Sequence, residues 1–128
     1  ILDIDNFKNI NDTYGHLVGD RVLKDLAEIL LNNTRKSDII ARFGGEEFII
    51  LALGVSSKEG VALAEKLKRI IAKHIFSSNS THFHITASFG VSSLSPDKYP
   101  NIESYISEAD QALYLAKKRG KNSVEMIS

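Results

Sequence analysis

The 128-residue sequence contains no cysteine, and its 16 basic side chains equal its 16 acidic ones in number. The absence of cysteine excludes disulfide cross-links and thiol catalysis, and it fits a reducing compartment. The absence of net charge excludes an overall basic field that would attract nucleic acid or a membrane surface. No apolar run approaches the length needed to span a bilayer. An anionic ligand would therefore have to meet locally clustered positive charge.

The length and composition are those of one globular domain. Hydrophobic residues make up 43% of the chain and charged residues 25%, which is enough to bury a core but leaves no room for a second domain. The first residues, Ile1 to Ile4, have the pattern of a buried strand near its end. We therefore expect a single domain over residues 1–128 that is truncated at its N-terminus relative to a longer parent protein.

Hydrophobic periodicity predicts the helices. Apolar residues at helical spacing indicate a short helical segment from Phe7 to Tyr14 and an amphipathic helix from about Asp20 to Asn32. Ser56 with Glu59 three residues later forms a capping box that opens a third helix. Pro96 and Pro100 mark a loop, after which Asn101 can cap a last helix that Gly120 ends.

The strands follow from short apolar runs between these helices. Ile39 to Ala41 and Phe48 to Leu51 flank a glycine-containing turn and predict a β-hairpin. Phe83 to Val91 alternates apolar with polar residues, which predicts a half-buried strand, and Ser123 to Ile127 predicts a short edge strand. The resulting order is β-α-β-β-α-β with an added C-terminal helix and short strand. This is a ferredoxin-like α+β fold with helices packed on a mostly antiparallel sheet.

The predicted hairpin has an acidic tip, Gly44-Gly45-Glu46-Glu47. The glycines allow positive φ and a close approach of a ligand, and the two carboxylates are hard oxygen ligands suited to Mg²⁺. A second acidic cluster lies at Asp3-Ile4-Asp5. In this fold the first two strands run in the same direction, so Asp3 and Glu46 should meet. The sequence therefore predicts a metal site for phosphate chemistry.

Three separated blocks resemble the GGDEF-domain diguanylate cyclases, in the GGEEF variant. The signature loop reads Gly44-Gly45-Glu46-Glu47-Phe48. The first block comprises Asp3-Ile4-Asp5-Asn6-Phe7-Lys8, Asn11-Asp12, Tyr14-Gly15-His16 and Gly19-Asp20, and the last comprises Ala109-Asp110, Ala112-Leu113-Tyr114, Ala116-Lys117 and Gly120-Lys121-Asn122. The resemblance implies a palm-type fold, as in adenylyl cyclases and polymerases. It also implies a nucleotidyltransferase of bacterial signalling that condenses two GTP into cyclic di-GMP and two pyrophosphates.

The resemblance also implies the metal site. It assigns Asp3, the main-chain carbonyl of Ile4, and Glu46 to two Mg²⁺ ions per active site, for which Mn²⁺ can substitute. These ions would activate a ribose 3′-hydroxyl and neutralise the triphosphate. Glu46 and Glu47 are the implied catalytic residues. Because a metal-bound carboxylate should have a low pKa, we favour a ligand role for Glu46 over a role as general base.

Substrate contacts are implied for eight further residues. Asn11 and Asp20 match the guanine-binding pair, and a carboxylate suits the N1–H and amino donors of guanine, which adenine lacks. The remaining implied substrate-binding residues are Lys8, His16, Lys117, Lys121, Gly44 and Gly45. Lys at position 121, where the family often has Arg, keeps the charge but loses bidentate pairing.

Arg35 and Asp38 match the Arg-x-x-Asp pattern of an inhibitory site at the usual offset before the signature loop. The resemblance implies that cyclic di-GMP binds there and represses its own synthesis. Lys66 stands where many members carry a further product-binding Arg. The alternative reading of Arg35 and Asp38 is an exposed ion pair that contributes little stability.

The resemblance implies partners as well. Each subunit of a homodimer would present one GTP to the other, so an isolated chain should show weak or concentration-dependent activity. An upstream sensory or receiver domain is implied in the parent protein, and a cytoplasmic location for this domain, with no nucleic-acid or membrane contact. The alternative function is a GTP-sensing or cyclic di-GMP-sensing domain without turnover, and intact Asp3, Glu46 and Glu47 favour the enzyme.

Overall fold

The computed structural model describes residues 1–93 and 101–127 of the chain. Over these residues the elements are, in chain order, β1 (Leu2–Ile4), α1 (Phe7–Tyr14), α2 (His16–Asn32), β2 (Ile39–Arg42), β3 (Glu47–Leu51), α3 (Ser57–Lys73), β4 (Phe76–Ser78), β5 (Thr81–Phe83), β6 (Ala87–Val91), α4 (Ile102–Lys118) and β7 (Val124–Met126). No helix among these residues is both long and apolar enough to cross a membrane.

Five strands form the main sheet in the order β2-β3-β1-β6-β7. All neighbouring pairs are antiparallel except β6 and β7, which are parallel and are connected through α4. The predicted α+β fold with a mostly antiparallel sheet is therefore confirmed. As predicted, β1 and β2 run in the same direction, because both pair antiparallel with β3.

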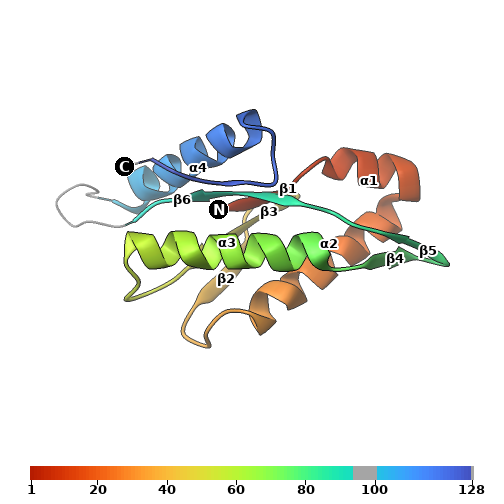
Figure 1. Ribbon diagram of the computed structural model, residues 1–128, viewed down its shortest axis with the longest axis horizontal. Helices are drawn as coiled ribbons and strands as arrows, with labels where there is room; N and C mark the ends of the chain where they lie inside the picture. The colour runs from red at the N-terminus through yellow and green to blue at the C-terminus, as the bar shows by residue number, and fades with distance from the viewer. Residues whose placement is uncertain (94–100, 128) are drawn as a thin grey trace.

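Helices cover both faces of this sheet (Figure 1). On one face α2 and α3 enclose the main core, to which β1 contributes Leu2 and Ile4. The fully buried side chains of this core include Leu2, Ile4, Val22, Leu26, Leu30, Leu67, Ile71 and Phe76. Asp3 alternates with the two apolar residues of β1 and therefore faces the opposite side, where α4 lies.

Packing of α4 on β6 depends on the absence of a side chain at Gly90. A Cβ atom at this position would lie 2.0 Å from the carbonyl oxygen of Ala109 and 2.4 Å from the nitrogen of Leu113. The backbone of α4 therefore rests directly on the backbone of β6. This close approach brings the C-terminal end of α4 to the end of β1.

The predicted strand from Phe83 to Val91 is wrong in extent and in burial. Phe83 belongs to a separate β4–β5 hairpin, and the main-sheet strand β6 begins only at Ala87. Residues 87–90 are all buried, because β6 contacts α3 on one face and α4 on the other. Burial on both faces removes the need for alternation.

The β4–β5 hairpin extends beyond the main sheet (Figure 1) and packs through aromatic rings. Phe83 stacks on Tyr14 of α1, with ring centroids 4.4 Å apart, and Phe76 lies 6.1 Å from Phe83. The hairpin was not predicted. Its two strands are three residues each, which is too short for a periodic signal.

The predicted helix caps are confirmed where the structure describes them. The capping box of Ser56 and Glu59 is present, and Asn101 caps α4 by accepting a hydrogen bond from the Ser104 amide. Helix α2 begins at His16, earlier than the predicted Asp20. The loop predicted from Pro96 and Pro100 falls outside the described residues.

Candidate active site

The tip of the β2–β3 hairpin meets the end of β1, as predicted. Asp3 lies opposite Glu47 in the antiparallel register, and the Ile4 amide donates to the Glu46 carbonyl at 3.4 Å. The N–H and C=O groups of one strand residue point to the same side, so the carbonyl of Ile4 is also directed toward β3. Three carboxylates and one carbonyl, from two segments that are more than 40 positions apart in the sequence, thus gather at one end of the sheet.

These carboxylates have pKa values above their ordinary range. Burial, followed by the charge of Asp3, raises the pKa of Glu46 and that of Glu47. Burial also raises the pKa of Asp3, against the opposing hydrogen bond and charge of Lys117. Like charges held in a partly buried site favour protonation or a bound cation.

The acidic residues fit a divalent cation in the manner of Mg²⁺. The Oδ1 atom of Asp3 is buried and has no hydrogen-bond partner within the described structure. Residues 1–93 and 101–127 contain no group of three or more Asp, Glu, His or Cys side chains arranged as a metal cage. Mg²⁺ commonly uses only one or two carboxylates and completes its shell with water and substrate phosphate. The donor set is therefore appropriate for a cation that arrives with a nucleotide.

Lys117 lies inside this acidic cluster. Its Nζ atom is 3.0 Å from Oδ2 of Asp3, and the carboxylate of Asp3 is only 13% exposed. The sequence predicted a phosphate contact for Lys117 and not this ion pair. The ammonium group and the carboxylates together form a site of mixed charge, in which a lysine stands beside the position of the implied metal.

Arg42 fixes the acidic tip and was not predicted to do so. Its side chain donates to the carbonyl of Gly45 at 2.6 Å and to that of Gly44 at 3.2 Å. Gly44 and Gly45 do not use the positive φ that glycine allows, since neither is among the positive-φ residues. Gly44 instead provides space, because a Cβ there would lie 3.0 Å from Oε1 of Glu47.

Asn11 of α1 packs into the surface of α2. A Cβ at Gly19 would lie 1.8 Å from Oδ1 of Asn11, so only glycine admits this side chain. The Oδ1 atom is buried and lacks a hydrogen-bond partner among the described residues. A buried acceptor of this kind is costly unless a ligand or water satisfies it. Asp20, which follows Gly19 in α2, is exposed. The predicted guanine-binding pair therefore lies on two adjoining helices.

The other predicted substrate residues are solvent-accessible. Lys8 on α1 and His16, the first residue of α2, are exposed. Lys121 follows α4, and its Nζ atom donates to Oδ1 of Asn6 at 2.6 Å. Asn6 is the N-cap residue of α1. Lys121 therefore connects the end of α4 with the start of α1.

Asp5, the second acidic residue of the Asp3-Ile4-Asp5 cluster, was not assigned to the metal, and its carboxylate is engaged within the protein. Its carboxylate accepts hydrogen bonds from Thr86 Oγ1, Ser88 Oγ and the Asn122 amide at 2.7, 2.7 and 2.9 Å. The sequence spacing of two residues could place Asp3 and Asp5 on one face of β1. It could not show which of the two carboxylates is already satisfied.

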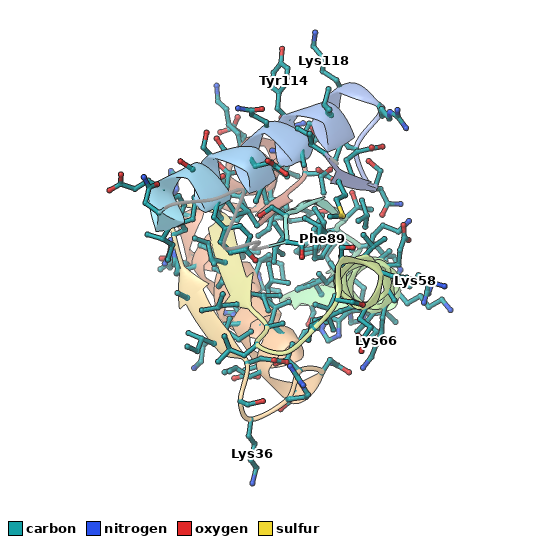
Figure 2. The ribbon with its side chains drawn as sticks, turned by 90° about the vertical axis from the view of Figure 1, so that its left-hand side faces the viewer. Lys36, Lys58, Lys66, Phe89, Tyr114 and Lys118 are labelled. Carbon is teal, nitrogen blue, oxygen red and sulfur yellow. The ribbon has the colours of Figure 1, made fainter. Side chains whose placement is uncertain are left out.

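The predicted inhibitory-site pair is an ordered ion pair. Arg35 contacts Asp38 through Nη2 at 2.9 Å and through its backbone amide at 2.8 Å, and the side chain of Asp38 is only 2% exposed. Burial alone raises the pKa of Asp38, but the Arg35 hydrogen bonds outweigh it and lower the net pKa. Lys66 of α3 reaches the Asn33 carbonyl at 3.4 Å. Lys36 projects away from the domain (Figure 2).

A cavity of about 670 Å³ lies elsewhere. Its walls are mostly apolar residues of β3, β6 and the N-terminal parts of α3 and α4, with Ile50, Leu63 and Ile106 among them. None of the candidate acidic or basic site residues lines this cavity. It therefore contributes nothing to the assignment of the site.

Comparisons with known proteins point to one family. The family described as "Diguanylate cyclase, GGDEF domain" matches residues 1–123. Diguanylate cyclase A of Treponema denticola is 40% identical over 126 residues, which are 98% of this chain and 34% of that protein. The chain thus spans about a third of the length of this relative.

Two solved structures resemble the fold closely. The active GGEEF domain of a diguanylate cyclase from Vibrio cholerae has a TM-score of 0.90 and 38% identity, covering 99% of this chain and 80% of that one. The GGDEF domain of DgcB from Caulobacter crescentus in complex with c-di-GMP has a TM-score of 0.89 and 31% identity, covering 98% and 74%.

Proposed function

The chain belongs to the diguanylate cyclase GGDEF-domain family, and from this membership we propose that it catalyses the condensation of two GTP into cyclic di-GMP. The observation that carries the proposal is the cluster of Asp3, Glu46 and Glu47 around an unpaired buried oxygen of Asp3. We further propose that residues 1–128 act as one catalytic domain. In the reaction each 3′-hydroxyl oxygen bonds to the α-phosphorus of the partner nucleotide, and each pyrophosphate leaves.

Asp3, Glu46 and the carbonyl of Ile4 would hold Mg²⁺, in two ions per site. When bound, the metal would lower the pKa of the attacking hydroxyl and neutralise the triphosphate. The hydrogen bonds of Arg42 to the Gly44 and Gly45 carbonyls would keep the acidic tip in place without the ligand. A site held rigid before binding loses less conformational entropy on binding.

The basic residues would bind the triphosphate. Lys117 is paired with Asp3 without nucleotide, and the ammonium can turn to a phosphate oxygen once the carboxylate has a metal. Lys8 lies on α1, His16 begins α2 and Lys121 follows α4, and Lys8 and His16 are exposed. These residues therefore supply the local positive charge that a chain without net charge needs.

Guanine would be read by Asn11 and Asp20. The unsatisfied Oδ1 atom of Asn11 can accept a hydrogen bond from the exocyclic amine of guanine, and the Asp20 carboxylate can accept from such donors. Adenine has no amine at that position and no N1–H. The pair therefore supports GTP as the substrate over ATP.

Turnover would need two chains. Each domain holds one nucleotide, and each 3′-hydroxyl must reach the α-phosphate of the other, so a homodimer supplies the proximity. Cyclic di-GMP would also bind at Arg35, Asp38 and Lys66 and inhibit synthesis, which the ordered Arg35–Asp38 pair supports. The c-di-GMP complex of the related DgcB domain is compatible with such binding.

The test is formation of cyclic di-GMP from GTP and Mg²⁺, followed by mass-resolved chromatography. Wild-type protein, an artificially dimerised form and the Glu46→Gln variant are compared over a range of protein concentrations. We expect product from the wild type, a rate that rises more steeply than linearly with concentration, and no product from Glu46→Gln. GTP binding without product in the dimerised form would instead support a sensing domain.

A further inference from the structure

Asp5 is a buried carboxylate outside the proposed reaction. It is 4% exposed, and the three hydrogen bonds that its carboxylate accepts come from other segments. Ser88 donates to Oδ1, while Thr86 and the backbone amide of Asn122 donate to Oδ2. The first two donors belong to β6 or lie just before it, whereas Asn122 lies in the turn between α4 and β7. Asp5 therefore joins β1, the β6 region and this turn.

The turn that Asp5 holds has an unfavourable backbone conformation. Gly120, Lys121 and Asn122 have φ values of 114, 66 and 44° in succession. Glycine tolerates this left-handed region, but lysine and asparagine adopt it at a cost in free energy. Such a conformation persists only where the surrounding structure fixes it. The hydrogen bond from the Asn122 amide to Asp5 is one such constraint, and the bond from the Lys121 amide to the Ala116 carbonyl at 3.2 Å is another.

The residue after Asp5 holds the side chain of the same turn. Asn6 is also left-handed, with φ 56°, and its Oδ1 atom accepts a hydrogen bond from Nζ of Lys121 at 2.6 Å. Asp5 thus binds the backbone of Asn122, and the adjacent Asn6 binds the side chain of Lys121. The result is a latch between the start of α1 and the end of α4, defined here as Asp5, Asn6, Lys121 and Asn122.

We propose that Asp5 is a positioning residue that sets the affinity for the triphosphate through Lys121. The proposal rests on the proposed function, in which Lys121 binds a phosphate. Asp5 helps to keep the turn in its left-handed conformation, and this conformation brings the Lys121 ammonium to Asn6, at the junction of β1 and α1. Without the latch the lysine would sample many orientations, and binding would pay for its ordering.

The carboxylate is needed rather than an amide of the same shape. The Asp5 carboxylate is the acceptor of three hydrogen bonds from the described residues. In Asp5→Asn one oxygen becomes an NH₂ group. With its oxygen toward Thr86 and the Asn122 amide, and its NH₂ toward Ser88, whose hydroxyl can rotate to accept, the amide can keep all three contacts. Its oxygen is uncharged, however, and hydrogen bonds to an ionised acceptor are roughly twice as strong as those to a neutral one, so the bond that holds the Asn122 amide is weakened.

The experiment is a double-mutant cycle of nucleotide binding. Wild type, Asp5→Asn, Lys121→Ala and the double variant are titrated with the α,β-methylene analogue of GTP and with GMP, both with Mg²⁺. We expect Asp5→Asn to weaken binding of the triphosphate on the order of tenfold, as loss of an outer-shell partner does, and binding of GMP much less. In the Lys121→Ala background the same change should have little further effect.

Ser88→Ala is the matched control, because it removes one donor to Asp5 and leaves the Asn122 bond. Its triphosphate affinity should stay close to that of the wild type, because the bonds that hold the turn, from the Asn122 amide to Asp5 and from Lys121 to Asn6, both remain. Equal losses for the triphosphate and GMP, or additive losses in the double variant, would show a general structural role and overturn the proposal.

Hydrogen exchange in the wild type tests the latch without any variant. Asn122 is exposed as a residue, so its amide should exchange quickly unless Asp5 binds it. Slow exchange is expected, and fast exchange would contradict the latch. A wild type that binds no GTP analogue defeats the proposed function itself, whereas normal wild-type binding with an unaffected Asp5→Asn variant defeats only the positioning role.

Discussion

Asp3 and Glu47 lie directly opposite each other in the pairing of β1 with β3. Like charges at such a position destabilise a sheet, and burial together with the Asp3 charge raises the pKa of Glu47 above its ordinary value of 4.5. A sheet that needed only stability would place an apolar or oppositely charged pair here. The arrangement is one in which function is maintained at the expense of stability.

The Glu47→Gln variant should be more stable than the wild type at neutral pH without metal. The gain should be about 0.2–1 kcal/mol, the range of a cross-strand pair, because one of two facing charges is removed. Because the pKa of Glu47 is higher in the folded state than in the unfolded state, this residue contributes its full stabilisation of the wild type below the unfolded pKa. The contribution is lost as the pH rises through the folded pKa. The gain should therefore vanish in acid. Urea unfolding with EDTA across this pH range measures it, and a less stable variant at neutral pH would count against the repulsion.

Mg²⁺ should stabilise the wild type most at neutral pH. The metal competes with protons for Asp3 and Glu46, whose pKa values are raised, so the metal-induced rise in Tm should shrink as the solution is acidified. Asp3→Asn should show little Mg²⁺-dependent rise at any pH. Thermal unfolding with and without Mg²⁺ provides the measurement. An equal rise in wild type and Asp3→Asn would place the cation elsewhere.

Gly90→Ala should destabilise the fold, because its Cβ would overlap the backbone of α4. Overpacking of this kind costs about 1–3 kcal/mol or more. Gly60→Ala in α3 is the matched control, since its Cβ would meet only Val91 Cγ1 at 3.6 Å. This variant should be more stable than the wild type by about 1 kcal/mol, because alanine favours the helix over glycine. Denaturant unfolding compares the two. Equal stabilities would show that α4 can move away from β6 without cost.

Gly19→Ala should weaken GTP binding without unfolding the protein. The new methyl group would occupy the position of Asn11 Oδ1, while alanine in a helix adds stability of its own. The loss of affinity should match that of Asn11→Ala, and combining the two changes should add little. Titration with a non-reacting GTP analogue tests this. Full affinity in Gly19→Ala would remove Asn11 from the guanine site.

Asp38→Ala should destabilise the protein at neutral pH by about 1–3 kcal/mol, as expected when hydrogen bonds to a charged group are lost. Its folded pKa is lowered, so this contribution is present above the unfolded value of 3.8 and is lost as pH falls through the folded pKa. The variant should also lose inhibition by cyclic di-GMP. Lys36→Ala, which alters the exposed neighbour, should change neither property. Unfolding curves and product-inhibition assays measure the two effects.

The sequence predicted the main elements because their signals are local. The capping box at Ser56 depends on a spacing of three residues, and the apolar stripes of α2 and α3 depend on helical periodicity. The meeting of Asp3 with Glu46 was also predictable, since the strand order fixes the direction of β1 relative to β3. The signature loop itself is a continuous segment.

Tertiary packing decided the features that the sequence left open. Ala87 to Gly90 are all buried because helices lie on both faces of β6, so the expected alternation did not identify its limits. The roles of Asp5, Arg42 and Lys117 depend on partners that come from other segments or from the folded tip.

By itself, then, the sequence determined which residue types stand at each helix, strand and turn, and which family pattern they resemble. The tertiary structure alone decided which carboxylate is fully hydrogen-bonded and which keeps an oxygen without a partner. Asp3 lies on β1 and Asp5 just after it, two residues apart, yet three donors surround Asp5 whereas Oδ1 of Asp3 has none among the described residues. The reason is that hydrogen bonding and burial depend on distances between atoms, which segments distant in sequence establish only when the chain folds.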